Sequence, residues 1–169
     1  MREGISRHTQ TERMLHDLAF SSWFPHASLS KIESFLYRKQ LAAIDVERPV
    51  FISALPRAGT TLLLELCVGT GEFVSHRYSD MPFVITPLLW HLFSKHFRRA
   101  GKLTERVHGD GILVNFESPD AFEEILWKKF WPSYYKKDKI LPWNNSDYPL
   151  FEEFFLEHMR KIIQLSIKK

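Results

Sequence analysis

The chain has 169 residues, of which 44% are hydrophobic and 25% charged, a composition that indicates one globular domain and excludes a disordered chain. Its formal charge of +3 at pH 7 is too small to indicate a nucleic-acid partner. No apolar run approaches the roughly 18 residues of a membrane span, and the polar N-terminal sequence has no signal-peptide core. The single cysteine, Cys67, excludes an internal disulfide and a multi-cysteine zinc site, so we expect the reducing environment of the cytoplasm.

Residues 1–48 are expected to form an N-terminal helical segment. Apolar side chains recur at helical spacing in two stretches, and Pro25 separates them as the predicted turn. The first stripe comprises Met14, Leu15, Leu18 and Ala19, and the second comprises Leu29, Ile32, Leu36 and Ala43. Neither stretch carries a chemical motif, so packing is the predicted role of both.

The sequence pattern changes at Pro49, where a short apolar run with β-branched residues predicts a buried strand over 49–55. Proline is tolerated at the start of a strand. The apolar run Leu62–Cys67 predicts a helix, and a tight loop that contains Gly59 joins the two elements. We therefore expect residues 49–169 to form a domain of the α/β class.

The loop of residues 54–61 reads A-x-x-x-x-G-T-T, the spacing of the phosphate-binding loop G-x-x-x-x-G-K-[ST] with two replacements. Backbone N–H groups after a strand form a shallow cup for an anion, and the following helix points its positive N-terminus at that cup. Gly59 permits close approach of the anion, and Thr60 and Thr61 add hydroxyl donors. Arg57 adds a positive charge and a planar fork of donors that fits phosphate or sulfate oxygens. The usual lysine and an acidic partner strand for Mg²⁺ are both missing, so we expect an anion bound without a metal.

The stretch FISALPRAGTTLL, residues 51–63, resembles the phosphosulfate-binding loop of the sulfotransferases, P-[RK]-[SA]-G-T-[ST]-x-L, in their bacterial-type and tyrosylprotein-like branch. That family transfers a sulfuryl group from 3′-phosphoadenosine 5′-phosphosulfate (PAPS) to a hydroxyl or an amine. The resemblance implies that the 5′-phosphosulfate is held by Arg57, Ala58, Gly59, Thr60 and Thr61. It also implies that Arg57 stabilises the charge that develops on the bridging oxygen as the sulfuryl group leaves.

A base that takes the acceptor's proton assists sulfuryl transfer to a hydroxyl. In many relatives an acidic residue or a histidine has this role shortly after the second strand, which we expect over 72–78. The resemblance therefore implies Asp80 as the first choice of base and His76 as the second. In the alternative interpretation, Asp80 caps the next helix and His76 lies at the end of a surface strand.

Three further helices are expected, over 87–97, 120–130 and 149–165. Ser118 is the predicted N-cap of the second, with Pro119 at its first position. The last helix has an apolar stripe in which we expect His158 to be a hydrogen-bonded core residue. This stripe comprises Phe151, Phe154, Phe155, His158, Ile162 and Leu165.

The resemblance implies a P-loop nucleotide-binding fold with three layers and a parallel sheet. Such a sheet needs about four or more strands, whereas two are expected here. Relatives also carry a second motif, an Arg and a Ser that grip the 3′-phosphate of the nucleotide, and the sequence stops before its place. We therefore expect an incomplete domain, the front half of a sulfotransferase, that is marginally stable and weakly active or inactive.

Two other functions stay open at this point. A nucleotide kinase or another phosphoryl transferase with a degraded phosphate loop would depend on Mg²⁺ and ATP. A non-catalytic remnant would bind a partner through an aromatic-rich surface formed by Trp127, Phe130, Trp131, Tyr134 and Tyr135. The sequence names neither the acceptor nor the oligomeric state.

Overall fold

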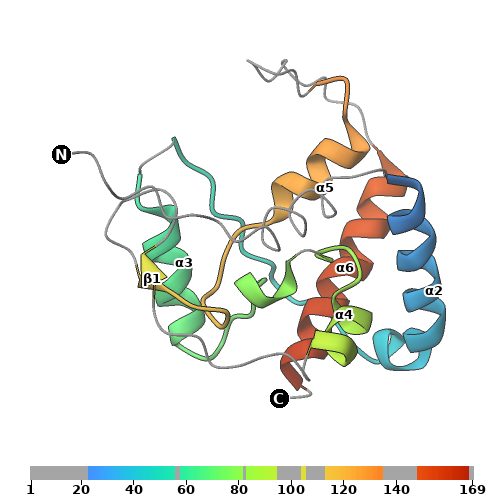
Figure 1. The fold of residues 1–169 in the computed structure, drawn as a ribbon, viewed down its shortest axis with the longest axis horizontal. Helices are drawn as coiled ribbons and strands as arrows, with labels where there is room; N and C mark the ends of the chain where they lie inside the picture. The colour runs from blue at the N-terminus through green and yellow to red at the C-terminus, as the bar shows by residue number, and fades with distance from the viewer. Residues whose placement is uncertain are drawn as a thin grey trace.

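The computed structural model describes residues 23–55, 58–81, 83–94, 104–105, 113–134 and 148–167. Helices dominate this part of the chain: α2 (Trp23–Ala42), α3 (Thr60–Gly69), η1 (Tyr78–Asp80, a 3-10 turn), α4 (Pro87–Ser94), α5 (Glu123–Phe130) and α6 (Pro149–Ile167). Two short strands, β1 (Thr104–Glu105) and β2 (Leu113–Val114), pair antiparallel. Figure 1 shows α2, α4 and α6 gathered on one side of the molecule and α3 on the opposite side.

Helices α2, α4 and α6 pack around a small apolar core although they are far apart in the sequence. The buried members are Leu41, Ile44, Leu88 and Leu165. The apolar stripe predicted for the last helix is confirmed in its main members, because Phe151, His158 and Leu165 are all buried. Within the described ranges, no helix combines the length and the apolar character needed to cross a membrane.

A buried ion pair joins the same three helices. The Lys161 Nζ of α6 lies 3.3 Å from Oε1 of Glu33 in α2, and both side chains are almost fully buried. Lys161 also donates to the hydroxyl of Ser30 at 3.0 Å. The other oxygen of Glu33 accepts the backbone N–H of Leu89, in the first turn of α4, at 2.7 Å. One carboxylate thus links α2 to both α6 and the N-terminal turn of α4.

Aromatic side chains of α5 pack against those of α6. The ring of Trp127 lies 4.6 Å from Phe151 and 5.7 Å from Phe155, and Phe130 lies 5.0 Å from Phe154. These rings surround the buried Leu126 in a second core cluster. Trp127 and Phe130 therefore serve in packing, and this observation weakens the prediction of an aromatic docking surface. Tyr135 lies outside the described residues.

The segment predicted as a buried strand, 49–55, is exposed. Residues 51–55 form no strand, and the side chains of Phe51 and Leu55 are 65% and 81% exposed. The stretch predicted as a second strand contributes only an isolated bridge between Arg77 and Pro119. A strand requires a neighbour to satisfy its backbone N–H and C=O groups, and no described segment pairs with 51–55. The three-layered α/β class with a parallel sheet therefore stays a prediction.

Two helix starts in the structure differ from the predictions. Pro25 lies in the first turn of α2, where proline is tolerated, and therefore is not itself in the predicted turn. Helix α5 starts at Glu123 with Phe122 as its N-cap. The Ser118 hydroxyl instead accepts the backbone N–H of Asn115 at 3.0 Å, so it closes a turn and caps no helix. The predicted first helix of the N-terminal segment lies outside the described residues.

Candidate functional site

The loop that precedes α3 has the conformation of a helix start with an open N-terminus. Gly59 has φ 83°, a left-handed conformation that glycine adopts without strain, and its carbonyl accepts the N–H of Leu63 at 3.1 Å. Because glycine has no side chain, no capping side chain covers the first turn of α3. Thr60 and Thr61 are the first two residues of the helix, which begins two residues before the predicted run Leu62–Cys67. Arg57 lies outside the described residues, so its role stays a prediction.

A large open cavity of about 980 Å³ lies against this helix start. Thr60 and Thr61 line it together with the segment 45–53 and α6. His76 and His158 also line the cavity, although they belong to segments that are 82 residues apart. The volume falls within the range of natural ligand sites. The structure therefore brings the last two residues of the predicted phosphate loop, Thr60 and Thr61, and one predicted base candidate, His76, to a single cavity.

His76 and His158 form a buried imidazole pair. The two Nε2 atoms lie 2.9 Å apart, and the residues are 1% and 2% exposed. Phe154 stacks on His158 with nearly parallel rings, and Phe122 meets His76 edge-on. The Nδ1 atom of each ring is buried without a hydrogen-bond partner among the described residues. These packed aromatic neighbours hold both rings in fixed orientations.

The surroundings of His158 disfavour its charged form. Burial lowers its pKa well below the ordinary value of 6.5, and the nearby His76 and Lys161 lower it further. His158 is therefore neutral at physiological pH. A neutral imidazole has one donor nitrogen and one acceptor nitrogen, so the pair can share a proton along the contact between the Nε2 atoms.

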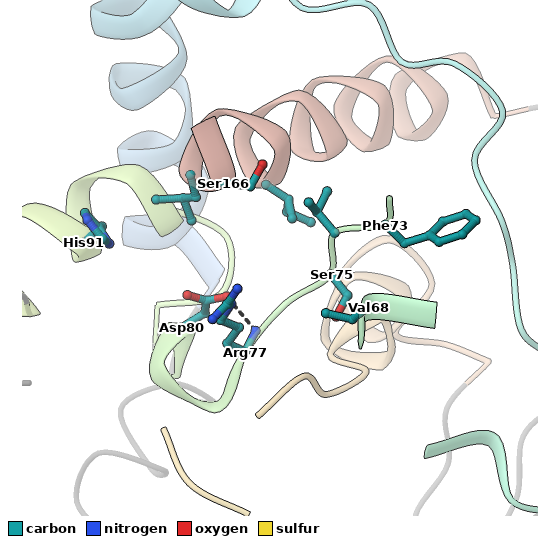
Figure 2. Close-up of a pocket in the computed structure, with 10 residues that line it drawn as sticks. Val68, Phe73, Ser75, Arg77, Asp80, His91 and Ser166 are labelled. Atoms are coloured by element: carbon teal, nitrogen blue, oxygen red, sulfur yellow. Dashed lines mark hydrogen bonds between the residues drawn. The ribbon is translucent and has the colours of Figure 1, made fainter. Parts of the chain in front are cut away.

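Asp80 lies next to His76 but does not line the large cavity. Its Oδ2 atom accepts the backbone N–H of Arg77 at 2.8 Å and lies 3.4 Å from the Nδ1 of His76. Figure 2 shows Asp80 and Arg77 side by side, with Asp80 at a small cavity of about 40 Å³ that His91 and Ser166 also line. In the turn η1, Asp80 is the third residue and its carboxylate accepts the N–H of the N-cap residue Arg77, so it closes this turn and does not cap the next helix, α4. The geometry thus brings Asp80 to His76, while only His76 reaches the cavity.

The sequence did not single out His158 as a site residue. It predicted a hydrogen-bonded core histidine at this position, and the contact with His76 confirms that prediction. No local pattern links His158 to His76, because the contact depends on how α6 packs against the segment that contains His76. The pair could be identified only from the fold, which brings the two segments together.

The comparisons with known proteins add no family assignment. No family model, no curated protein and no solved structure matches the chain. Among the described residues, no group of three or more His, Cys, Asp or Glu side chains is placed to hold a metal ion. The functional interpretation therefore depends on the cavity and on the resemblance of residues 51–63.

Proposed function

We propose that the chain carries the donor site of a sulfotransferase, which transfers a sulfuryl group from PAPS to a hydroxyl or an amine. The observation that carries the proposal is that Thr60 and Thr61 line the same cavity as His76 and His158. Sulfuryl transfer needs both of these parts: an anion site for the phosphosulfate and a base for the acceptor. In this proposal the start of α3 supplies the anion site and a histidine of the same cavity supplies the base.

The transfer would proceed by in-line displacement. The acceptor oxygen or nitrogen bonds to sulfur as the bond from sulfur to the bridging oxygen breaks, and adenosine 3′,5′-bisphosphate leaves with that electron pair. The positive N-terminus of α3, the hydroxyls of Thr60 and Thr61, and Arg57 would stabilise the charge on the departing oxygen. Ala58 and Gly59 would contribute backbone N–H groups to the same anion.

The charge distribution in the cavity restricts where an anion can bind. Several acidic side chains line the wall together with Arg48: Asp45, Glu47, Glu72, Asp120 and Glu123. A phosphosulfate would be repelled from that wall, because like charges in a partly desolvated site destabilise each other. The first turn of α3, where Thr60 and Thr61 line the cavity, is therefore the place in the cavity that favours a sulfate or phosphate.

A calorimetric titration with adenosine 3′,5′-bisphosphate, without metal, tests the proposal. We expect micromolar affinity, about −8 kcal/mol. The Arg57→Ala variant should lose at least about tenfold in affinity, about 1.4 kcal/mol, because it loses a charge-assisted contact. Arg38→Ala is the matched control, since Arg38 lies on α2 over the ring of Phe35, away from the cavity.

Two outcomes would contradict the proposal. The first is a folded chain that does not bind adenosine 3′,5′-bisphosphate, or that binds it equally well after Arg57→Ala. The second is binding of ATP that depends on Mg²⁺ and excludes the bisphosphate, which would favour the kinase alternative. The non-catalytic alternative would gain support only from the first outcome, because the packed aromatic cluster does not favour it.

A further inference from the structure

We propose that Arg48 binds the 3′-phosphate of the donor nucleotide, so that the donor is held at both of its anionic ends. The inference rests on the proposed function, because it names a second contact to the same nucleotide. PAPS and adenosine 3′,5′-bisphosphate carry a phosphate on the 3′ oxygen of the ribose in addition to the anionic group at the 5′ end. The start of α3 is assigned to the 5′ end, so the 3′-phosphate requires a cation elsewhere in the cavity.

Arg48 is the cation that the cavity offers for this second phosphate. Among the described residues that line the cavity of about 980 Å³, it is the only arginine or lysine. The acidic side chains of the same lining repel an anion at the other charged positions. The guanidinium has a permanent charge and a planar fork of N–H donors that matches the oxygens of a phosphate. Arg48 is therefore the place on this wall that attracts a phosphate.

The guanidinium of Arg48 is open to a ligand. Asp45 and Glu47 are its close neighbours in the sequence, and both line the same cavity. Arg48 nevertheless makes no ion pair and no hydrogen bond with any residue in the described part of the chain. Its side chain is exposed, so its donors are accessible from the cavity. No contact within the described chain would have to break before a phosphate binds.

The backbone at Arg48 is strained, which indicates that its side chain has a role. Its φ angle is 50°, and no other non-glycine residue of the described ranges has a positive φ. This region is uncommon for a residue with a side chain, and the following Pro49 disfavours it further, because proline restricts the preceding residue to extended backbone. Glycine would make the same turn at lower cost. Strain of this kind is found preferentially at ligand-binding positions.

Contacts on both sides of Arg48 hold the strained turn in place. Before it, Ile44 is buried in the core, and its carbonyl accepts the Nε–H of Arg160 at 3.2 Å. After it, the ring of Phe51 stacks on Phe155 with centroids 6.0 Å apart. Arg160 and Phe155 both belong to α6, so the two ends of the segment are attached to one helix. The position of the turn at the cavity wall is therefore fixed by the packing around it.

Two attachment points would give the nucleotide one orientation. The cavity volume lies at the upper end of the range for natural small-molecule sites, which leaves room for the nucleoside between the two points. In-line displacement requires a defined direction of the bond that breaks. A donor held only at its 5′ end could rotate about that end, whereas a donor also held at Arg48 could not. The second contact thus contributes both affinity and alignment.

Calorimetric titration of the chain with two nucleotides tests the inference without metal and without turnover. Adenosine 3′,5′-bisphosphate carries the 3′-phosphate, and adenosine 5′-monophosphate lacks it. We expect wild type to bind the bisphosphate at least about tenfold more tightly than the monophosphate. Arg48→Gln should lose about tenfold in affinity for the bisphosphate and less than about twofold for the monophosphate, because only the 3′-phosphate contacts this residue. Arg48→Lys, which restores the charge without the fork, should recover part of the preference.

Two control variants locate the effect. Arg57→Ala should weaken both nucleotides by a similar factor and leave the preference for the bisphosphate unchanged, since Arg57 is assigned to the 5′ end. Arg38→Gln removes the same charge from α2, where Arg38 lies over the ring of Phe35 and away from the cavity, and should change neither affinity.

Arg48→Gly separates ligand binding from a purely structural role of the turn. Glycine adopts a φ of 50° without strain, so we expect a urea midpoint no lower than that of Arg48→Gln. The variant should nevertheless lose the preference for the bisphosphate. If Arg48 serves only to shape the turn, Arg48→Gly will keep the wild-type preference.

The outcomes distinguish this inference from the proposed function. Equal affinity of wild type for the two nucleotides, or a preference that survives in Arg48→Gln and Arg48→Gly, would overturn the inference and leave the proposed donor site standing. A folded chain that binds neither nucleotide would overturn the proposed function, and the inference with it. A preference that is lost in both Arg48 variants and kept in Arg38→Gln and Arg57→Ala would establish Arg48 as the site of the 3′-phosphate.

Discussion

At the scale of single residues, the burial of His158 makes the stability of the chain sensitive to acid. The pKa of His158 is held below 6.5 in the folded chain by burial and by the nearby His76 and Lys161, and it returns to about 6.5 on unfolding. Below that value the unfolded chain binds a proton that the folded chain does not bind. The free energy of unfolding is therefore unaffected above about pH 6.5 and decreases as the pH falls below it.

Urea unfolding at pH values between about 7 and 5 measures this effect. We expect the midpoint of wild type to decrease more steeply with falling pH than that of His158→Gln, which has no titrating ring at this position. Equal slopes for the two proteins would show that His158 is charged in the folded chain, contrary to its burial.

A second residue with a displaced pKa is Lys129 of α5. Burial lowers the pKa of its ammonium group from 10.5 to about 8, because a charge is less stable away from water. Competitive acylation followed by mass spectrometry reports this pKa from the pH dependence of labelling. We expect half-maximal labelling of Lys129 near pH 8, whereas a midpoint near 10.5 would contradict the burial of its amine.

At the scale of helices, the ion pair between Glu33 and Lys161 is the most sensitive contact. Burial raises the pKa of Glu33, and Lys161 lowers it in part, so the carboxylate depends on its partner. We expect Lys161→Met to destabilise the chain by about 3–5 kcal/mol, since the variant leaves a buried charge and a Ser30 hydroxyl without their partner. Chemical denaturation measures this loss.

The control for this ion pair is Lys31→Met on the exposed face of α2, which should change stability by less than about 0.5 kcal/mol. The double variant Glu33→Gln, Lys161→Met should recover part of the loss, because the amide oxygen can still accept from Leu89 and no charge stays buried. If Lys161→Met lowers the free energy of unfolding no more than Lys31→Met does, the charges of Glu33 and Lys161 do not stabilise one another.

The sequence predicted a helix well where the apolar face of that helix packs against another element of the described chain. The stripe of α6 repeats at helical spacing and packs on α2 and α5, so periodicity was a sufficient signal. The run 51–55 has an equally strong sequence signal for a strand, yet a strand forms only where a neighbouring segment pairs with it. For the site, a local motif located the start of α3 to within two residues, because the helix begins at Thr60 and not at Leu62. The imidazole pair depends on a contact over 82 residues and left no local signal.

At the scale of the whole molecule, stability is unevenly distributed. Helix α3 is strongly apolar in sequence but has no buried residue, and Leu62, Leu63 and Leu66 are all largely exposed. Helices α2, α4 and α6 contain the buried core and the ion pair. A helix of ten residues without tertiary packing is marginal in water. We therefore infer that α3 opens far more readily than the rest of the described chain.

Amide hydrogen exchange measured with and without adenosine 3′,5′-bisphosphate tests this inference together with the proposed site. Without ligand, we expect peptides from α3 to exchange nearly as fast as an unfolded chain, and those from α6 to be protected. With ligand, protection should appear in the first turn of α3, because an anion held at the helix N-terminus stabilises only the folded helix. Arg57→Ala should remove the protection induced by the ligand while leaving α6 unchanged. Slow exchange of α3 without ligand would show that its apolar face is packed in solution, and protection that appears elsewhere would place the bisphosphate outside the loop.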